Sequence, residues 1–410
     1  MINSIKKIRT VNKEFSFKDL SALTDYAEGY FTDGDKLVAS PSVKETGTLK
    51  NGLRCVRIYD IGFTVYYCSD GKLYRKVNGE FKEYGIPALS TPPEVFSVIY
   101  DGKKTAAAVL GSGAYLLNDR ISFVSMVKGN AYAVFKGTLF IAKGRKIIVC
   151  GDAEYSGEQI TVNPSTFLYP EGRYGAVIKF VEISGEFFAV CQRGAVKIAL
   201  TGDDMEYSVE DCALPPFKSV PESIVSMGNE AYFININGLC RFNGRRVEKI
   251  NSFFDKKIIE PCGEATAKDN YYLIPVNVGG QRKIYCMDCL SGKDAFIDGS
   301  GIIVAGENTA SYITDKTGEI GVYNSERKWK SVKTDFGARG KKTVSCIYIE
   351  SDYDVNVKID GDGVVRNFTV KAGEGETPLS MSAEKFAFTL SDGVGNPLNV
   401  ISGLSVKYRL

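Results

Sequence analysis

Apolar and polar residues alternate along most of the chain in short runs, and each run ends at a turn signal. Alternation with a period of two places one face of a β-strand in a core and the other face in water. The signals are dipeptides that favour two-residue hairpin turns: Asn-Gly at 51, 78, 237 and 243, and Asp-Gly at 33, 70, 101, 298, 360, 362 and 392. The pattern predicts an all-β protein built from antiparallel hairpins.

The hairpin pattern also repeats. Residues 63–84 and 231–250 share one layout, in which an aromatic-rich strand, a tight turn, a short strand, an Asn-Gly turn and a polar closing strand follow one another. Weaker copies occur between and beyond them, and one turn glycine from each copy gives a mean spacing of about 41 residues, close to the roughly 40–50 of a propeller blade: Gly71, Gly113, Gly144, Gly194, Gly238, Gly280 and Gly318. We therefore predict a six- or seven-bladed β-propeller-like domain over residues 46–332, with stacked sandwiches as the alternative.

The pattern changes after Trp329. Residues 331–343 are polar and contain glycine, which is typical of a linker. Beyond them the alternation is regular, as in residues 355–359 and 404–410. Strands with one apolar and one polar face predict a small C-terminal β-sandwich over residues 333–410.

Helical spacing of apolar residues is scarce. Residues 16–28 carry Phe17, Leu20, Leu23 and Ala27 at such spacing, so we expect a short helix there, capped by Ser16. This helix would belong to an N-terminal arm, residues 1–45. Residues 250–259 are a second short helical candidate.

Composition restricts the chemistry. The 410 residues include no histidine, which excludes a Ser-His-Asp triad and a His-ligated zinc site and removes the commonest general base. The 51 Lys and Arg residues balance 49 Asp and Glu, so the net charge of +2 does not indicate nucleic-acid or membrane binding. We predict a protein that is not an enzyme and uses no cofactor, and we assign no catalytic, cofactor-binding or metal-ligating residue.

The ten cysteines lie mostly inside apolar runs, where free cysteine behaves as a small apolar residue. We therefore expect free thiols in a reducing cytoplasm. The first residues lack the apolar stretch of a signal peptide, and no run approaches the roughly 20 apolar residues of a spanning helix. The expectation is synthesis in the cytoplasm without a membrane anchor.

Three local motifs suggest chemistry but have simpler explanations. Cys286 and Cys289 form a lone CxxC without the second pair that a zinc site needs. The DGDG sequence at 360–363 lacks a glutamate at the twelfth position of a calcium loop, so we predict a hairpin turn. The acidic stretch 203–211 could supply the two carboxylates of a glycosidase, but we interpret it as a solvated loop.

Several segments resemble the β-propeller tail nozzle proteins of short-tailed bacteriophages, also called tail tubular or tail hub proteins. They are RRVEKINSFFDKKI at 245–258, AKDNYYLIPV at 267–276, the RKIYCMDCLSGKDAF run, SERKWKSVKTDFGARGKKTVSCIYIES around the single tryptophan, and the ending LNVISGLSVKYRL. DYAEGYFTDGDKLVASPS at 25–42 is similar to the N-terminal arm of that family. The resemblance covers about half of the chain and rests on layout. At 410 residues the chain is short for the family, and it lacks the histidines often found there.

The resemblance implies a structural virion protein. Copies would form a ring, commonly a hexamer, below the portal and its adaptor, and DNA would pass transiently through its channel. Other tail proteins would be further partners. The location would be the tail of the virion, assembled in the cytoplasm of the host bacterium.

Two other functions remain open from the residues alone. One is a propeller binding module, either a carbohydrate-binding adhesin or a protein-interaction scaffold, and the other is a propeller hydrolase. For an interface we predict the basic linker residues Arg339, Lys341 and Lys342 beside Trp329, because a linker between rigid domains is exposed.

Overall fold

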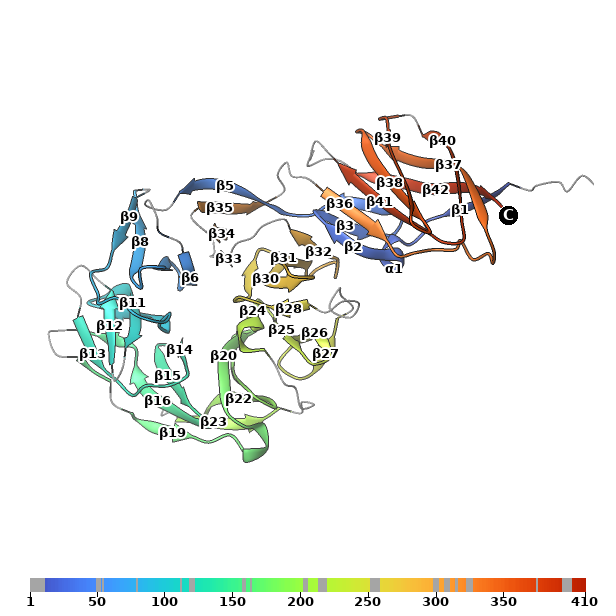
Figure 1. The fold of residues 1–410 in the computed structure, drawn as a ribbon. Coiled ribbons are helices and arrows are strands. Elements are labelled where there is room, and N and C mark those ends of the chain that lie inside the picture. Colours follow the sequence, from blue (N-terminus) through green and yellow to red (C-terminus); the bar gives the residue numbers. More distant parts are fainter. Residues whose placement is uncertain are drawn as a thin grey trace, which may run out of the picture. The chain divides into compact units, whose positions relative to one another are not determined.

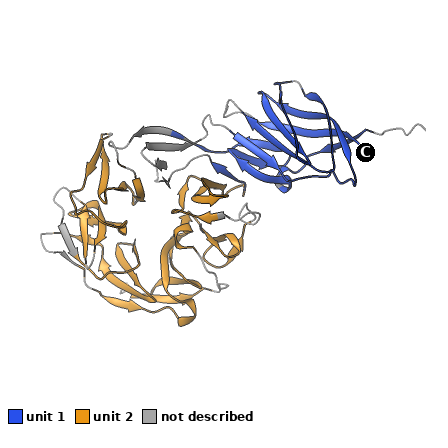
Figure 2. Cartoon of the chain, viewed as in Figure 1, with its two compact units in different colours: residues 1–44, 293–298, 321–410 blue, residues 45–292, 299–320 orange. Residues whose placement is uncertain are grey.

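The computed structural model describes residues 12–48, 53, 55–78, 80–110, 113–117, 122–156, 160–162, 164–201, 206–212, 220–250, 259–297, 302–305, 310–313, 316–321, 327–373, 375–392 and 400–410. The chain divides into two compact units (Figure 2). Unit 1 comprises residues 1–44, 293–298 and 321–410, and unit 2 comprises residues 45–292 and 299–320. The chain therefore crosses between the units four times.

The strands of unit 2 form small antiparallel sheets that follow one another along the chain (Figure 1). The first blade contains β6 (Cys55–Asp60), β7 (Thr64–Cys68), β8 (Leu73–Val77) and β9 (Glu80–Glu83). The second contains β10 (Val95–Tyr100), β11 (Lys103–Leu110), β12 (Gly113–Leu117) and β13 (Ser122–Ser125), with the short β17 (Glu154–Tyr155) and β18 (Ile160–Thr161) at its edges. The third contains β14 (Ala131–Phe135), β15 (Thr138–Lys143), β16 (Lys146–Asp152) and β19 (Thr166–Leu168).

The next blades repeat this arrangement, with two 3₁₀ turns between them. The fourth blade contains β20 (Val177–Ile183), β21 (Glu186–Cys191), β22 (Gly194–Thr201) and β23 (Glu206–Asp211), preceded by η1 (Gly172–Tyr174), and the fifth contains β24 (Val225–Met227), β25 (Glu230–Asn235), β26 (Gly238–Phe242) and β27 (Val247–Lys249), preceded by η2 (Pro221–Ser223). The sixth contains β28 (Ile259–Pro261), β29 (Thr266–Lys268), β30 (Tyr271–Val278) and β31 (Gln281–Asp288). The seventh contains the hairpin of β33 (Ile302–Ala305) and β34 (Ala310–Ile313). β5 (Ser42–Thr48) pairs with β35 (Lys316–Gly321).

The first strands of these blades are the inner strands of a ring. From β10 onward, each inner strand lies beside the next one, in the order β10, β14, β20, β24, β29 and β33. β33 in turn lies beside β6. The first and second blades share an apolar cluster that includes Val65 and Ala106, which closes the ring (Figure 1). Within the described residues, unit 2 thus has seven inner strands, and the predicted propeller is confirmed. The predicted repeat of about 41 residues corresponds to one blade.

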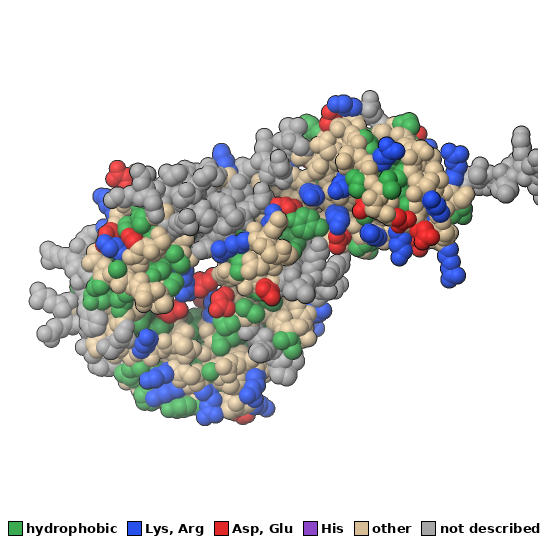
Figure 3. Space-filling model, in the orientation of Figure 1, with side chains coloured by type: hydrophobic (Ala, Val, Ile, Leu, Met, Phe, Trp, Pro, Cys, Tyr) green, Lys and Arg blue, Asp and Glu red, His purple; other side chains and the backbone are tan. Residues whose placement is uncertain are grey.

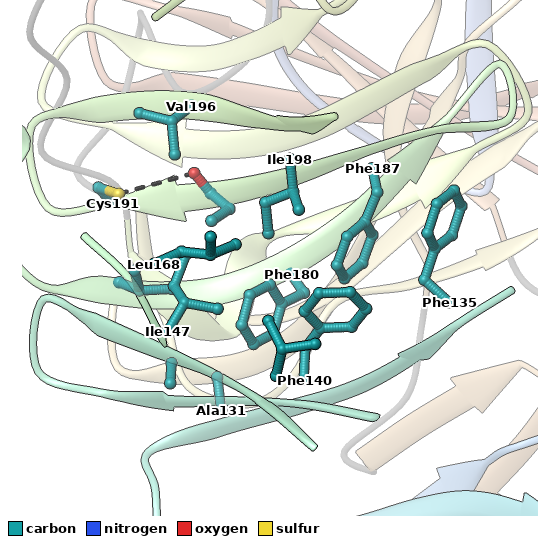
Figure 4. Packing of buried hydrophobic residues seen from close by; sticks show 14 of the residues in the cluster. Ala131, Phe135, Phe140, Ile147, Leu168, Phe180, Phe187, Cys191, Val196 and Ile198 are labelled. Carbon is teal, nitrogen blue, oxygen red and sulfur yellow. Dashed lines mark hydrogen bonds between the residues drawn. The ribbon is translucent and has the colours of Figure 1, made fainter. Parts of the chain in front are cut away.

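The third blade buries both of its faces, and its strands are nearly uninterrupted runs of apolar residues. In β15, Leu139 and Ile141 pack toward the second blade, while Phe140 between them packs toward the fourth. Figure 4 shows this second cluster, where the rings of Phe140 and Phe187 lie 4.8 Å apart between their centroids. A period of two in a fully apolar strand therefore serves two cores, one on each side of the blade.

Unit 1 is a β-sandwich whose sheets draw on both ends of the chain. One sheet follows the order β3 (Tyr30–Asp33), β4 (Lys36–Ala39), β42 (Ile401–Arg409), β37 (Lys342–Ser351) and β40 (Glu376–Ala383), with β1 (Lys13–Ser16) also paired to β42. The other follows β32 (Asp294–Ile297), β2 (Thr24–Glu28), β36 (Arg327–Ser331), β41 (Phe386–Asp392), β38 (Val355–Gly361) and β39 (Val364–Val370). The predicted sandwich is present, but its boundaries differ from residues 333–410.

The N-terminal segment differs from the predicted arm. Only α1 (Leu20–Leu23) is helical, and Asp19, not Ser16, accepts a hydrogen bond from the Ala22 N–H (3.3 Å). Residues 24–28 form β2 because their pairing with β36 buries Thr24 and Ala27, which outweighs the local helical spacing. The helical candidate at 250–259 falls almost entirely outside the described residues.

The predicted interface residues separate into two kinds. Trp329 is fully buried and its indole N–H donates to the Thr24 hydroxyl oxygen at 2.7 Å. Lys342 is 1% exposed, and its ammonium donates to the carbonyl oxygens of Gly340 (2.6 Å) and Glu384 (2.8 Å). Arg339 and Lys341 are exposed as expected. The prediction that the linker residues are exposed is wrong for Lys342, and the buried Trp329 beside them offers no surface to a partner. The reason is that residues 331–343 connect two strands inside unit 1 and do not link separate domains.

All ten cysteines are free thiols. Burial raises the pKa of Cys150 and of Cys191 to about 12. These two thiols are therefore held in their protonated, unreactive form at neutral pH.

Candidate functional site: a charged cluster at the channel mouth

The two faces of the propeller carry different parts of the chain. Because the strands of a blade alternate in direction, all inner strands begin on one face, together with the loops that precede them. We call this the proximal face, and the opposite one, where inner strands turn back into second strands, the distal face. Loops on one face of such a scaffold are the usual location of binding residues.

Ionisable side chains from several blades meet at the start of the inner strands. Arg57 lies in β6 and Lys179 in β20, while Glu94 directly precedes β10 and Glu264 lies two residues before β29. Glu222, in the 3₁₀ turn before β24, interacts electrostatically with Lys179 and favours the charged form of the lysine. We call these five residues the axial cluster. Acidic and basic side chains also border the opening of the propeller unit on the face shown in Figure 3.

Arg57 is the centre of the axial cluster. Its guanidinium forms an ion pair with Glu264 and a second, longer one with Glu94 (Nη1 to Oε1, 3.6 Å). The guanidinium carbon also lies 4.8 Å from the ring centre of Tyr59. Although burial disfavours its charge, the carboxylates of Glu264 and Glu94 raise the pKa of Arg57. The Nε atom of Arg57 is buried and has no hydrogen-bond partner within the described residues.

Lys179 places a second cation near the first. Its ammonium donates to the Ile224 carbonyl oxygen at 2.5 Å. Burial lowers the pKa of Lys179, and the nearby Arg57 acts in the same direction, while Glu264 opposes the shift. Two cations and three carboxylates from five blades thus share one channel mouth.

The lowered pKa of Lys179 predicts a pH-dependent stability. Between that pKa and the ordinary value of 10.5, the unfolded chain binds the proton more readily than the folded one, so stability rises with pH across this interval. The free energy of unfolding of the wild type relative to Lys179→Met should therefore increase as the pH approaches 10.5. Urea unfolding of both proteins at pH 7 to 10.5 measures it. A difference that stays constant with pH contradicts the assignment.

A cleft adjoins the axial cluster on the proximal face, and Glu94 belongs to both. The cleft has a volume of about 350 Å³. The segment from Leu89 to Glu94, which includes Pro92 and Pro93, forms one wall, and Val109, Leu110 and Tyr132 from neighbouring strands form another. The Tyr132 ring stacks on Phe96 (5.3 Å), which holds the wall in place. Ser90, Thr91 and Lys128 also line the cleft, so the site combines the charged axial cluster with a cleft that has both apolar and polar walls.

The motifs singled out in the sequence do not contribute to this site. Cys286 is buried in β31, and the Cys289 Sγ lies 3.6 Å from the Met227 Sδ. The 360–363 segment is the turn between β38 and β39, as predicted, with Asp362 at φ 51° and Gly363 at φ 90°. Of the acidic stretch, only residues 206–211 are described, and they form β23, where Asp211 pairs with Arg173. Residues 203 and 204 lie outside the described part.

Sequence reasoning missed the axial cluster because its members are far apart and form no motif. A usable signal was the position of each charge near the start of a predicted inner strand, an apolar context in which charge is uncommon.

Within the described residues, no group of three or more Cys, Asp and Glu side chains is arranged to hold a metal ion. In the same part of the chain, no helix is long and apolar enough to cross a bilayer.

No protein-family model and no curated protein matches the sequence. Solved structures with a similar fold include BamB from Moraxella catarrhalis, an AfRom2 CNH domain, and BBS1N in complex with ARL6DN. Their identities to this chain are 11%, 12% and 13%, and their TM-scores are 0.38, 0.42 and 0.40. They cover 76%, 70% and 72% of this chain and 96%, 100% and 96% of their own. At these values the likeness does not carry a function to this chain, and the propeller fold rests on the topology of the sheets.

Proposed function

We propose that the chain is a non-catalytic binding module whose proximal face holds an extended segment of a partner protein. The observation that carries this proposal is the axial cluster, in which charged residues of five blades lie near one another beside a cleft with both apolar and polar lining residues. Sites that combine apolar surface with a few polar groups that fix orientation are typical of recognition.

The geometry around Arg57 favours a ligand that carries a hydrogen-bond acceptor. Two ion pairs hold the guanidinium in place, while its buried Nε–H finds no acceptor among the residues that the structure describes. Buried donors without partners are uncommon in folded proteins. A backbone carbonyl or a carboxylate of a bound segment would satisfy this donor. An apolar side chain of the same segment would fill the cleft beside Glu94.

The ion pairs also favour binding over hydrolysis. A glycosidase needs one carboxylic acid that donates a proton and one free carboxylate. Glu94 and Glu264 are both paired with the guanidinium of Arg57, so neither is left as a free carboxylate. The arrangement is therefore better suited to holding a ligand than to proton transfer.

The proposal is tested by selecting peptides from a random library against the full chain and measuring their affinity by calorimetry. Peptides should bind wild type, and Arg57→Met should weaken them by at least about tenfold. Glu94→Gln, at a side chain that is 45% exposed, provides a milder variant that still folds. Lys197→Met, which removes the ion pair with Glu186 on the fourth blade, is the matched control and should leave binding unchanged.

Equal affinity in wild type and Arg57→Met contradicts the proposed site. Turnover of a glycoside substrate that is lost in Glu264→Gln contradicts the non-catalytic function and supports a hydrolase.

A ring-forming tail nozzle protein is the second candidate. The resemblance in sequence around Trp329 favours it, as does a chain that joins a propeller to a sandwich. Of the interface residues predicted earlier, Arg339 and Lys341 are the exposed ones that a neighbouring copy or the portal could contact.

Light scattering followed by negative-stain electron microscopy, with and without phage portal–adaptor complexes, tests this candidate. A closed ring of about six copies supports it. A monomer that does not bind the portal complexes contradicts it. Arg339→Ser with Lys341→Ser should weaken ring formation if these residues lie at the interface.

A further inference from the structure

A second cavity lies on the distal face, between the fifth and sixth blades. Its volume is about 600 Å³, within the roughly 300–1,000 Å³ of small-molecule sites. It is lined at the turns that join β24 to β25, β29 to β30 and β26 to β27, and by residues just after β31. It shares no residue with the axial cluster or its cleft.

The cavity is lined by several side-chain amides, because asparagine is favoured at the tight turns that surround it. Asn229, Asn243 and Asn270 all line it, each at or beside a tight turn. The side-chain oxygen of Asn243 accepts hydrogen bonds from the backbone N–H groups of Arg245 and Arg246, both at 3.1 Å, which fixes the plane of its amide. Each amide offers both donors and acceptors.

Two carboxylates complete the polar lining, and among the described residues no lysine or arginine lines the cavity. Glu230 accepts a hydrogen bond from the Tyr232 hydroxyl at 2.6 Å and lies 3.7 Å from Arg241. Asp269 lies 3.9 Å from the ammonium of Lys268. An anionic ligand would meet the two carboxylates directly, while the nearest cations, Arg241 and Lys268, are already paired with them, so phosphates and acidic sugars are disfavoured.

A cationic ligand is also disfavoured. Both carboxylates already have a cation nearby in the protein. An aromatic cage for an ammonium group needs an exposed ring face, but Tyr232 is 3% exposed. What is left is a set of amide and carboxylate groups around the apolar surfaces of Met227, Ala267 and Leu290, the last of which is 78% exposed.

We propose that this cavity binds a neutral saccharide of two to three units. Adjacent amide donors and carboxylate acceptors match the paired hydroxyls of a sugar ring, and the apolar surfaces match its C–H face. The proposal goes beyond the partner-binding function, because it concerns the opposite face and other residues. Either site can be present without the other.

The test uses the full chain with neutral oligosaccharides (maltotriose, lactose and triacetylchitotriose), an acidic one (trigalacturonate) and choline. Saturation-transfer NMR detects binding and calorimetry measures affinity. At least one neutral oligosaccharide should bind, and Asp269→Asn and Asn270→Ala should each weaken it by about tenfold. Both positions are exposed turn residues, so the variants are expected to fold.

Asp101→Asn is the matched control. Asp101 occupies the equivalent turn between β10 and β11, with φ 46° against 51° at Asp269, and lies outside the cavity. This variant should bind like the wild type. The proposal is overturned if no neutral oligosaccharide binds, if Asp269→Asn and Asn270→Ala bind as well as the wild type, or if trigalacturonate or choline binds more tightly.

Discussion

Replacing Arg327 by methionine is expected to lower the free energy of unfolding of unit 1 by about 3–5 kcal/mol. Arg327 and Asp392 form an ion pair (Nη1 to Oδ2, 3.7 Å) in which both side chains are fully buried. Removing one charge leaves the other desolvated without its counterion, which is the costly case for buried pairs. Burial lowers the pKa of Arg327, while Tyr30 and Asp392 favour its charged form.

The single tryptophan makes this measurement specific. Trp329 lies two residues from Arg327 in β36, so its fluorescence follows the unfolding of unit 1. Denaturant titrations of the wild type and Arg327→Met give the difference directly. Lys371→Met is the control, because the ion pair of Lys371 with Asp354 is exposed. This variant should change the free energy of unfolding very little.

A double replacement separates desolvation from packing. Arg327→Met with Asp392→Leu removes both charges and should recover much of the loss, since apolar substitutes for a buried pair are often neutral. A small effect of Arg327→Met alone, similar to that of Lys371→Met, would show that the pair is solvated in solution and contradict its assigned burial.

Truncating Trp329 to alanine is the substitution with the second large expected effect. We expect it to lower the free energy of unfolding by about 3–5 kcal/mol. The ring is fully buried and packs against Phe17, with ring centres 6.5 Å apart. It therefore joins β36 to the N-terminal segment as well as filling the sandwich core.

Trp329→Phe separates the contribution of packing to the free energy of unfolding from that of the hydrogen bond to Thr24. The smaller ring keeps part of the packing and loses the hydrogen bond to Thr24, so the expected loss is about 1–3 kcal/mol. The Thr24 hydroxyl still donates to the Leu20 carbonyl oxygen at 2.6 Å and is not left without a partner. Calorimetry or circular dichroism measures both variants, since neither retains tryptophan fluorescence. Near-wild-type stability of Trp329→Ala would contradict the burial of this ring.

The propeller could be predicted from the sequence because its information is local. Turn dipeptides and alternating strands fix each hairpin, and their spacing of about 41 residues fixes the blade. Short-range pairing such as Asn235 with Gly238 in the fifth blade needs only the turn between them.

The membership of the sandwich could not be predicted in the same way. Ser16 pairs with Ser405 and Ala27 pairs with Trp329, partners separated by most of the chain. Nothing in the alternation of residues 13–39 specifies which distant strand completes it. Local helical spacing around Leu20 and Leu23 therefore predicts too long a helix, and residues 331–343 after Trp329 are wrongly predicted to be a linker between domains.

The axial cluster was also beyond sequence reasoning, since its geometry depends on ring closure. Arg57 and Glu264 are brought together only because the inner strands are arranged around one axis. Reading charge at the start of each predicted inner strand would have identified Arg57 and Lys179 as candidates.

The most direct test of the proposed function is an experimental structure of the full chain bound to a library-selected peptide. The account predicts the peptide on the proximal face, with an acceptor atom within hydrogen-bond distance of the Arg57 Nε and an apolar side chain in the cleft beside Glu94. A peptide bound on any other surface, with the Arg57 Nε still unpaired, would contradict it.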